Sequence, residues 1–175
     1  MRLGSLIEEL DAEVAKAVSA AGGLDTSVTG FAIDNRKVAP GTVFGAFQGL
    51  RVNGEDYIPE AVRAGAIAIV ARPEAQVDGA IHIAAVNPRQ LFAQLAARFF
   101  APFPDVTVAV TGTNGKTSTV ELARQIWRML GHNAASIGTL GVTTSVDQVS
   151  TGLTTPDIVT FLANMSGLKR EGITH

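Results

Sequence analysis

The sequence contains no cysteine, which excludes disulfide bonds and thiolate metal sites. Aromatic residues are scarce, at 6% of the chain, with one Trp and one Tyr. An excess of charge of one sign is also lacking, because 14 Lys and Arg stand against 16 Asp and Glu. The formal net charge of −2 argues against a nucleic-acid partner. The 46% of hydrophobic residues among 175 is typical of a folded globular protein.

Long hydrophobic runs are missing as well. No uninterrupted apolar stretch reaches the roughly 20 residues that a membrane-spanning helix needs. The amino-terminal stretch carries Glu8, Glu9, Asp11 and Glu13, which is not typical of a secretory signal peptide. The sequence therefore predicts a cytoplasmic protein without a membrane partner.

Short apolar runs of strand type alternate with segments of helical spacing in the first half of the chain. Strands are predicted at 28–33, 42–47, 66–71 and 81–84, and a short helix at 57–64. Ser5 and Glu8 fit a capping box for an amino-terminal helix that Gly22 and Gly23 end. This alternation predicts an α/β fold, with a small amino-terminal domain whose sheet is mainly parallel.

A second domain is predicted from a fresh helix start. Asn87 is a suitable N-cap residue and Pro88 suits the first helical position, while 102–105 contains two prolines that end the helix. The expected domains are therefore residues 1–88 and 89–175.

The most informative stretch is 106–118. A β-branched apolar run at 106–110 leads into a turn bracketed by Gly112 and Gly115, and Lys116 and Thr117 open a helical segment. This order is typical of a phosphate-binding strand, loop and helix. The common form of that loop has a further glycine five residues before Gly115, where this chain has Val110. The alternative interpretation is a Gly/Asn turn that carries a lysine by coincidence.

The segments after this loop extend the second domain. Val120, Ala123, Ile126, Trp127 and Leu130 are predicted to form the inner face of a helix. A strand is expected at 133–137, a loop that approaches a ligand at 138–144, and a last helix opened by residues 153–157. Taken alone, Thr154 and Thr155 are ordinary N-cap residues, and Asp157 is a first-turn charge that complements the helix dipole.

Several of these segments carry a family resemblance. Residues 111–118, Thr-Gly-Thr-Asn-Gly-Lys-Thr-Ser, resemble the shortened ATP-binding loop of the Mur ligases, the ATP-dependent amide ligases of peptidoglycan precursor synthesis. Residues 34–44 and 49–58 are similar to two amino-terminal segments of that family. Residues 137–141 and 153–157 resemble the branch that adds the third residue of the stem peptide. Asn35 and Asn53 depart from the Ser and Asp that are common in the family.

The resemblance implies ATP and Mg²⁺ as cofactors. It implies a catalytic role for Lys116, with Thr117 as the metal ligand. The implied ATP-binding residues are Gly112, Thr113, Asn114, Gly115, Lys116, Thr117 and Ser118.

The resemblance also implies a uridine-nucleotide substrate, with contacts in both domains. The implied substrate-binding residues are Ile33, Asn35, Arg36, Gly49, Leu50, Arg51, Val52, Thr154 and Thr155. From the residues themselves, Asp34 and Arg36 equally fit a local ion pair that shapes the turn.

The implied reaction transfers the ATP γ-phosphate to the D-glutamate carboxylate of UDP-N-acetylmuramoyl-L-alanyl-D-glutamate. An amine of meso-diaminopimelate or L-lysine then attacks the acyl phosphate. Family members are much longer, so the chain is expected to be an amino-terminal part without full activity by itself. The alternatives are the related ligase that adds D-alanyl-D-alanine, a nucleotide-binding module without catalysis, and an unrelated P-loop ATPase.

Overall fold

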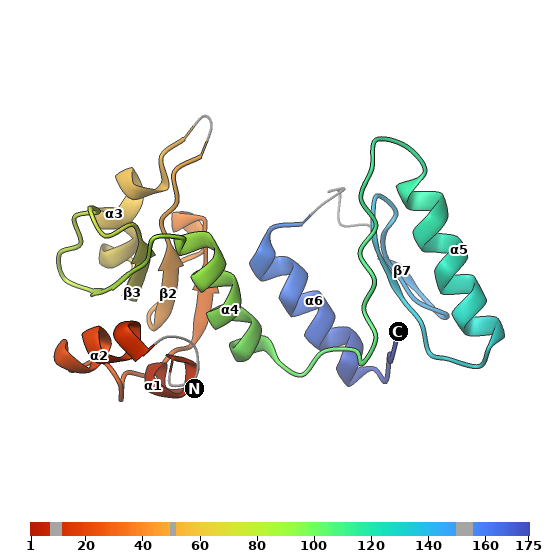
Figure 1. Cartoon of the computed structure of the whole chain (residues 1–175), viewed down its shortest axis with the longest axis horizontal. Helices are drawn as coiled ribbons and strands as arrows, with labels where there is room; N and C mark the ends of the chain where they lie inside the picture. The colour runs from red at the N-terminus through yellow and green to blue at the C-terminus, as the bar shows by residue number, and fades with distance from the viewer. Residues whose placement is uncertain (8–11, 50–51, 150–155) are drawn as a thin grey trace. The chain divides into compact units, whose positions relative to one another are not determined.

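The computed structural model describes residues 1–7, 12–49, 52–149 and 156–175. The chain forms two compact units, Met1–Phe99 and Phe100–His175, called here the first and second unit (Figure 1). Each unit combines helices with a small sheet, which confirms the predicted α/β class.

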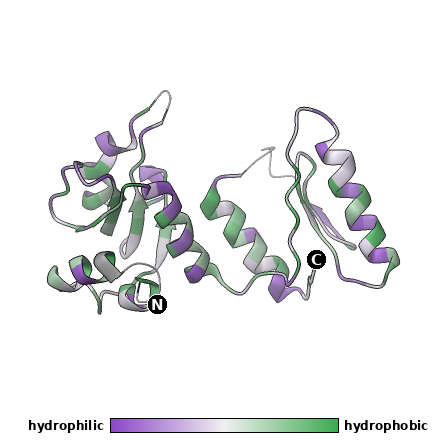
Figure 2. Cartoon of the chain, viewed as in Figure 1, coloured by the Kyte–Doolittle hydropathy of each residue, from purple (hydrophilic) through white to green (hydrophobic). Residues whose placement is uncertain are grey.

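The first unit is built on a four-stranded parallel sheet in the order β1-β2-β3-β4. Parallel pairing agrees with the sequence prediction, and the sheet segments are mostly hydrophobic (Figure 2). The strands are β1 (Gly30–Ala32), β2 (Thr42–Gly45), β3 (Ala66–Ala71) and β4 (Ile81–Ala84). The other elements of this unit are α1 (Leu3–Ile7), α2 (Ala12–Ala20), η1 (Asn35–Lys37), η2 (Gly54–Tyr57), α3 (Ile58–Arg63) and α4 (Pro88–Phe100).

The core of the first unit lies against this sheet. Phe44 and Ile69 pack with Ile58 and Ala61 of α3 in one buried cluster. Because side chains alternate along a strand, Val43 and Val70 are buried on the opposite face. A sheet covered on both faces accounts for the continuous apolar sequence of β3.

All of helix α4 except its last residue, Phe100, belongs to the first unit. The ring of Phe92 lies 5.4 Å, centroid to centroid, from the rings of both Phe31 and Phe47. Arg98 donates from Nη1 to the Leu6 carbonyl over 3.2 Å. The boundary between the compact units therefore follows Phe99, eleven residues later than the expected division after residue 88. The helix start is as predicted, since the Asn87 side chain accepts the Gln90 N–H at 3.3 Å.

The second unit contains α5 (Lys116–Met129), β5 (Ser136–Gly138), β6 (Gly141–Thr143), β7 (Gln148–Val149) and α6 (Ile158–Arg170). Its strands form an antiparallel sheet in the order β5-β6-β7. The segment 138–144, expected to be a loop, instead contains the tight turn of the β5–β6 hairpin and all of β6.

The strand predicted at 106–110 is not formed in the described structure. Val106 donates its N–H to the Thr174 carbonyl at 3.0 Å, and the extended residues after it join neither sheet. Val106 and Val108 are 40% and 59% exposed. The apolar, β-branched pattern alone does not make a strand, because a strand requires a paired neighbour.

Three helix details also differ from the predictions. Ser5 lies inside α1, because backbone groups of the 24–26 turn accept the N–H groups of Leu3 and Gly4 and replace a side-chain cap. Ile126 and Leu130 are 54% and 69% exposed, because none of the described residues of the second unit covers that side of α5.

Asp157 is the N-cap of α6 rather than a first-turn charge, because it accepts the Thr160 N–H at 2.9 Å. Among the described residues, no helix combines the length and apolar character needed to cross a membrane.

The assignment of α4 to the first unit can be tested with Phe92→Ala. Phe92 is fully buried, so its truncation is expected to destabilise the first unit by about 3–5 kcal/mol. Gln94→Ala, on the exposed side of the same helix, is the matched control with little expected effect. Urea unfolding followed by circular dichroism measures both, and equal stability of the two variants would contradict the assignment.

Candidate functional site

The loop at 111–115 leads into α5 through two glycines with positive φ. Gly112 has φ 145° and Gly115 has φ 79°, which residues with a side chain adopt only under strain. Gly115 is the N-cap residue of α5 and provides no side-chain acceptor. The first N–H groups of a helix have no intrahelical acceptor, and at α5 no N-cap side chain replaces it, so these groups and the positive end of the helix dipole face the loop. These groups favour an anion at this position.

Lys116 folds back over this loop. Its ammonium donates a hydrogen bond to the Gly112 carbonyl, four residues earlier. This contact places a positive charge beside the uncapped N–H groups of α5. Gly112, Thr113, Asn114 and Gly115 form the loop and Lys116, Thr117 and Ser118 the first turn of α5, so the structure brings the predicted ATP-binding residues together.

Thr117 supplies a hydroxyl at the same end of α5. Its Oγ1 lies 3.3 Å from Oγ1 of Thr139, which belongs to the β5–β6 turn. Neutral hydroxyl oxygens fit Mg²⁺, which prefers oxygen ligands and often takes few from the protein when phosphates supply others. The described residues contain no group of three His, Asp or Glu that could hold a metal by themselves. A divalent cation here would therefore depend on phosphate oxygens as well as on the Thr117 hydroxyl.

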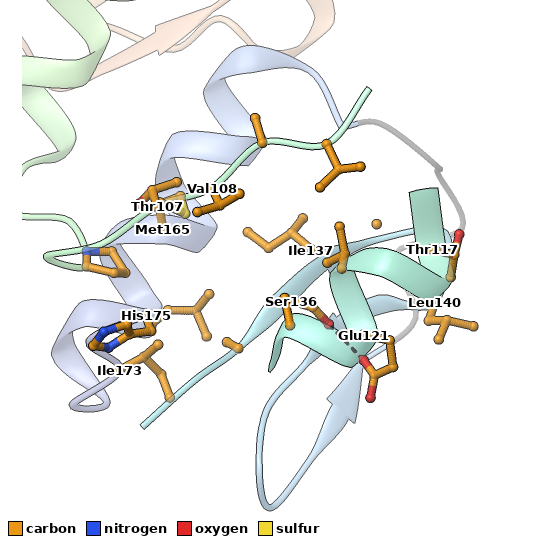
Figure 3. Close-up of a pocket in the computed structure, with 18 of the residues that line it drawn as sticks. Thr107, Val108, Thr117, Glu121, Ser136, Ile137, Leu140, Met165, Ile173 and His175 are labelled. Atoms are coloured by element: carbon orange, nitrogen blue, oxygen red, sulfur yellow. Dashed lines mark hydrogen bonds between the residues drawn. The ribbon is translucent and has the colours of Figure 1, made fainter. Parts of the chain in front are cut away.

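A buried ion pair attaches α5 to the neighbouring hairpin. The Arg124 side chain is 7% exposed and is bonded through Nε and Nη2 to the Glu121 carboxylate. Nη1 of Arg124 donates to the Thr144 carbonyl at 3.1 Å. The Ser136 hydroxyl donates to Glu121 at 3.4 Å, a bond that Figure 3 draws as a dashed line. These bonds connect the middle of α5 with β5 and with the residue that follows β6.

The same contacts set the ionisation of the pair. The hydrogen bond from Arg124 lowers the pKa of Glu121, although burial opposes the shift. The hydrogen bond to Glu121 in turn raises the pKa of Arg124. Sequence reasoning missed this pair; the opposite charges three residues apart on a predicted helix were the available signal.

An apolar cavity of about 350 Å³ opens beside the loop. Lys116 and Thr117 line it together with residues from α5, β5 and α6 (Figure 3). Most of its other lining residues are aliphatic or aromatic, including Val108, Val120, Ile137 and Met165. The cavity is therefore mainly apolar, with polar groups at the start of α5 and also at Thr107, Ser136, Thr139 and His175.

The second predicted group of site residues lies in the first unit. Ile33, Asn35 and Arg36 directly follow β1, and Gly49 follows β2 by four residues. Because β1 and β2 are parallel, these segments leave the same edge of the sheet, where α/β proteins commonly bind ligands. Ile33 and Val52 are 37% and 56% exposed.

Asn35 and Arg36 both make side-chain contacts within the first unit. Asn35 donates from Nδ2 to Glu60 at 2.8 Å, and Arg36 binds both oxygens of Asp34, at 2.7 Å for the closest pair. The hydrogen bond from the Arg36 side chain lowers the pKa of Asp34 from 3.8 to about 2. The Asp34–Arg36 pair that shapes the turn is thus confirmed. Leu50, Arg51, Thr154 and Thr155 lie outside the described residues.

The loop after β2 is held by a main-chain hydrogen bond and by an ion pair. Gly49 donates its N–H to the Val52 carbonyl at 2.9 Å, and a Cβ at Gly49 would lie 2.8 Å from that oxygen. Arg72 binds both oxygens of Glu55, at 2.7 and 2.9 Å, and joins η2 to the end of β3. Sequence reasoning missed this pair, because partners 17 residues apart leave no local pattern.

Together these features define an α/β protein with a glycine-bracketed loop of the phosphate-binding type in its second unit. Comparison with known proteins identifies the particular family. The Mur ligase family, catalytic domain matches residues 27–110, and the Mur ligase middle domain matches residues 110–175. The chain belongs to the Mur ligase family.

Curated relatives include two UDP-N-acetylmuramoyl-L-alanyl-D-glutamate--2,6-diaminopimelate ligases. The one from Zymomonas mobilis is 62% identical over 86% of this chain and 31% of its own length. The one from Bradyrhizobium diazoefficiens is 44% identical over 100% of this chain and 35% of its own length. The chain thus spans about a third of the length of these relatives.

The fold agrees with a solved structure of the same kind of ligase. That structure, of a UDP-N-acetylmuramoyl-L-alanyl-D-glutamate--2,6-diaminopimelate ligase, matches 99% of this chain and 34% of its own length with a TM-score of 0.77. The sequence identity is 24%, so this match supports the fold.

The buried pair predicts a pH-dependent stability of the second unit. Because the pKa of Glu121 is lowered, its contribution is present above the ordinary carboxyl value of 4.5 and is lost as the pH falls through the folded-state value. Glu121→Gln is expected to cost about 2 kcal/mol at pH 7 and progressively less below pH 4.5.

Fluorescence of Trp127, the single Trp of the chain, follows unfolding of this unit. Glu171→Gln, which changes an exposed carboxylate of the same unit, is the control. A Glu121→Gln deficit that stays constant from pH 7 to pH 3 would disprove the role of the pair.

Proposed function

We propose that this chain carries the ATP-binding and uridine-substrate-binding segments of an ATP-dependent amide ligase of peptidoglycan precursor synthesis. The observation that carries the proposal is the loop of Gly112–Ser118, where Lys116, the Thr117 hydroxyl and the uncapped start of α5 converge. The names of the similar ligases support the choice of reaction.

ATP binds with its terminal phosphates at the start of α5. Lys116 exchanges the Gly112 carbonyl for phosphate oxygens, and the N–H groups of the first turn donate to the same anion. Thr117 directs its hydroxyl oxygen to Mg²⁺, which when bound offsets negative charge on the phosphates. Thr113, Asn114 and Ser118 complete the loop around them. Lys116 is the catalytic residue, because it stabilises charge that develops on the transferred phosphoryl group.

The uridine nucleotide binds at the carboxyl edge of the parallel sheet. Asn35 offers an amide that donates and accepts hydrogen bonds, and Arg36 offers an exposed guanidinium on a turn that Asp34 fixes. Ile33 and Val52 supply exposed apolar surface at this edge. The remaining substrate contacts are assigned to Gly49, Leu50 and Arg51 and, at the muramoyl dipeptide, to Thr154 and Thr155.

The reaction proceeds in two steps. The D-glutamate side-chain carboxylate accepts the γ-phosphoryl group, which converts a poor acyl donor into an acyl phosphate and releases ADP. The amine of the incoming amino acid attacks the acyl carbon, and phosphate leaves as the amide forms. The names of the relatives favour 2,6-diaminopimelate over L-lysine as this amino acid.

A chain that binds both ligands without turnover is the second candidate. It is favoured by the chain's span of about a third of its relatives. Phosphate release that requires both UDP-N-acetylmuramoyl-L-alanyl-D-glutamate and 2,6-diaminopimelate would exclude this candidate.

The ATP site is tested with Lys116→Ala. Loss of the charged hydrogen bonds to phosphate is expected to weaken Mg²⁺-ATP binding at least about tenfold in calorimetric titration. Arg170→Ala removes one exposed positive charge from the same unit and is expected to bind as the unmodified chain does. Equal affinity of the two variants would refute the assignment of the loop.

The uridine site is tested with two substitutions of Asn35. Asn35→Ala removes the amide and is expected to weaken binding of UDP-N-acetylmuramoyl-L-alanyl-D-glutamate about 3–10-fold. Asn35→Ser restores a polar group of the kind common in the family and is expected to recover most of the affinity. Unchanged binding by Asn35→Ala, measured beside an Arg63→Ala control, would place the uridine elsewhere.

A further inference from the structure

The proposed ATP site contains a second hydroxyl group, that of Thr139, which has no role in the chemistry described above. It lies 3.3 Å from the Thr117 hydroxyl, although the two residues are 22 positions apart. Thr139 occupies the tight turn in which Gly138 of β5 pairs with Gly141 of β6. The hairpin therefore brings a second hydroxyl to the first turn of α5.

The position of this turn is fixed from several sides. Nε2 of Gln148 donates to the Leu140 carbonyl at 3.0 Å, which braces the turn from β7. Arg124 donates to the Thr144 carbonyl and Ser136 donates to Glu121, which join the hairpin to α5. The hydroxyls of Thr117 and Thr139 thus lie close together because these hydrogen bonds hold the β5–β6 hairpin against α5.

The hydrogen bond between Thr117 and Thr139 is not needed to satisfy buried polar groups. Thr117 and Thr139 are both exposed, so water can replace either partner at little cost in stability. The contact also lies at the uncapped end of α5, beside Lys116, where the anion is expected. Its place suggests a role in orienting the Thr117 hydroxyl.

The chemistry of a hydroxyl that binds a cation provides that role. A threonine hydroxyl has one proton and two lone pairs. When a lone pair faces a cation, the proton must point away from the cation, and an acceptor on the opposite side fixes that orientation. Oγ1 of Thr139 lies within hydrogen-bonding distance of Thr117 and can accept this proton.

We propose that Thr139 is a positioning residue for Mg²⁺-ATP binding. It accepts the hydroxyl proton of Thr117 and so turns a lone pair of Thr117 toward the cation. This inference rests on the proposed ATP site, and Thr139 acts on the cation only through Thr117.

The test is to measure, by calorimetry, how the affinity of the full chain for ATP depends on the Mg²⁺ concentration. Thr139→Val keeps the shape of the side chain and removes the hydroxyl. It is expected to lower the apparent Mg²⁺ affinity about 3–10-fold while leaving the affinity for ATP in excess EDTA unchanged. Thr139→Ser retains the hydroxyl and is expected to restore the Mg²⁺ dependence. Ser145→Ala, an exposed hydroxyl deletion in the turn between β6 and β7, is the matched control.

A double-mutant cycle separates positioning from a general effect on the hairpin. Because Thr139 acts through Thr117, Thr139→Val is expected to add no further loss of Mg²⁺ affinity in a Thr117→Val background. Additive losses, equal losses with and without Mg²⁺, or a Thr139→Val variant that binds Mg²⁺-ATP normally would each overturn the proposal. If the unmodified chain binds no ATP, the proposed ATP site and this inference both fail. If it binds ATP and Thr139→Val does so equally well, only the inference fails.

Discussion

The packing of α5 against the neighbouring hairpin in the second unit depends on the guanidinium of Arg124. This side chain is nearly buried, and its bonds to Glu121 and to the Thr144 carbonyl connect α5 with the hairpin that follows it. Removing one partner of a buried pair leaves an uncompensated charge, so the pair constrains which arrangements of α5 and the hairpin are stable. The contacts of Arg124 therefore help to set the position of the loop before α5 relative to the turn that carries Thr139.

The two candidate sites illustrate different ways of supporting a ligand. At the sheet edge of the first unit, a parallel scaffold delivers two loops to one place, and ion pairs such as Glu55–Arg72 stabilise them. In the second unit, the helix terminus itself provides the N–H groups, and Lys116 adds charge. The first site thus relies on loops held by side chains, whereas the second relies on main-chain groups whose orientation α5 already fixes.

Sequence reasoning succeeded where the signal was local. The bounds of β3 and β4, the Asn87 cap and the glycines of the phosphate loop each follow from a few adjacent residues. It failed where the outcome depends on a distant partner. Residues 106–110 have strand-like composition but lack a paired neighbour among the described residues, and the Thr117–Thr139 contact arises only when the hairpin packs on α5. The role proposed for Asn35 rests on the family resemblance alone, since an asparagine beside a turn has many ordinary explanations.

The apolar cavity of the second unit has a consequence for its behaviour under hydrostatic pressure. The folded unit leaves an apolar recess of about 350 Å³ that is open on one side, so water already reaches part of it. Pressure favours the state of smaller total volume, and sensitivity to pressure scales with the internal voids that unfolding removes. Only the part of the recess that water does not fill in the folded state can make α5 and α6 sensitive to compression.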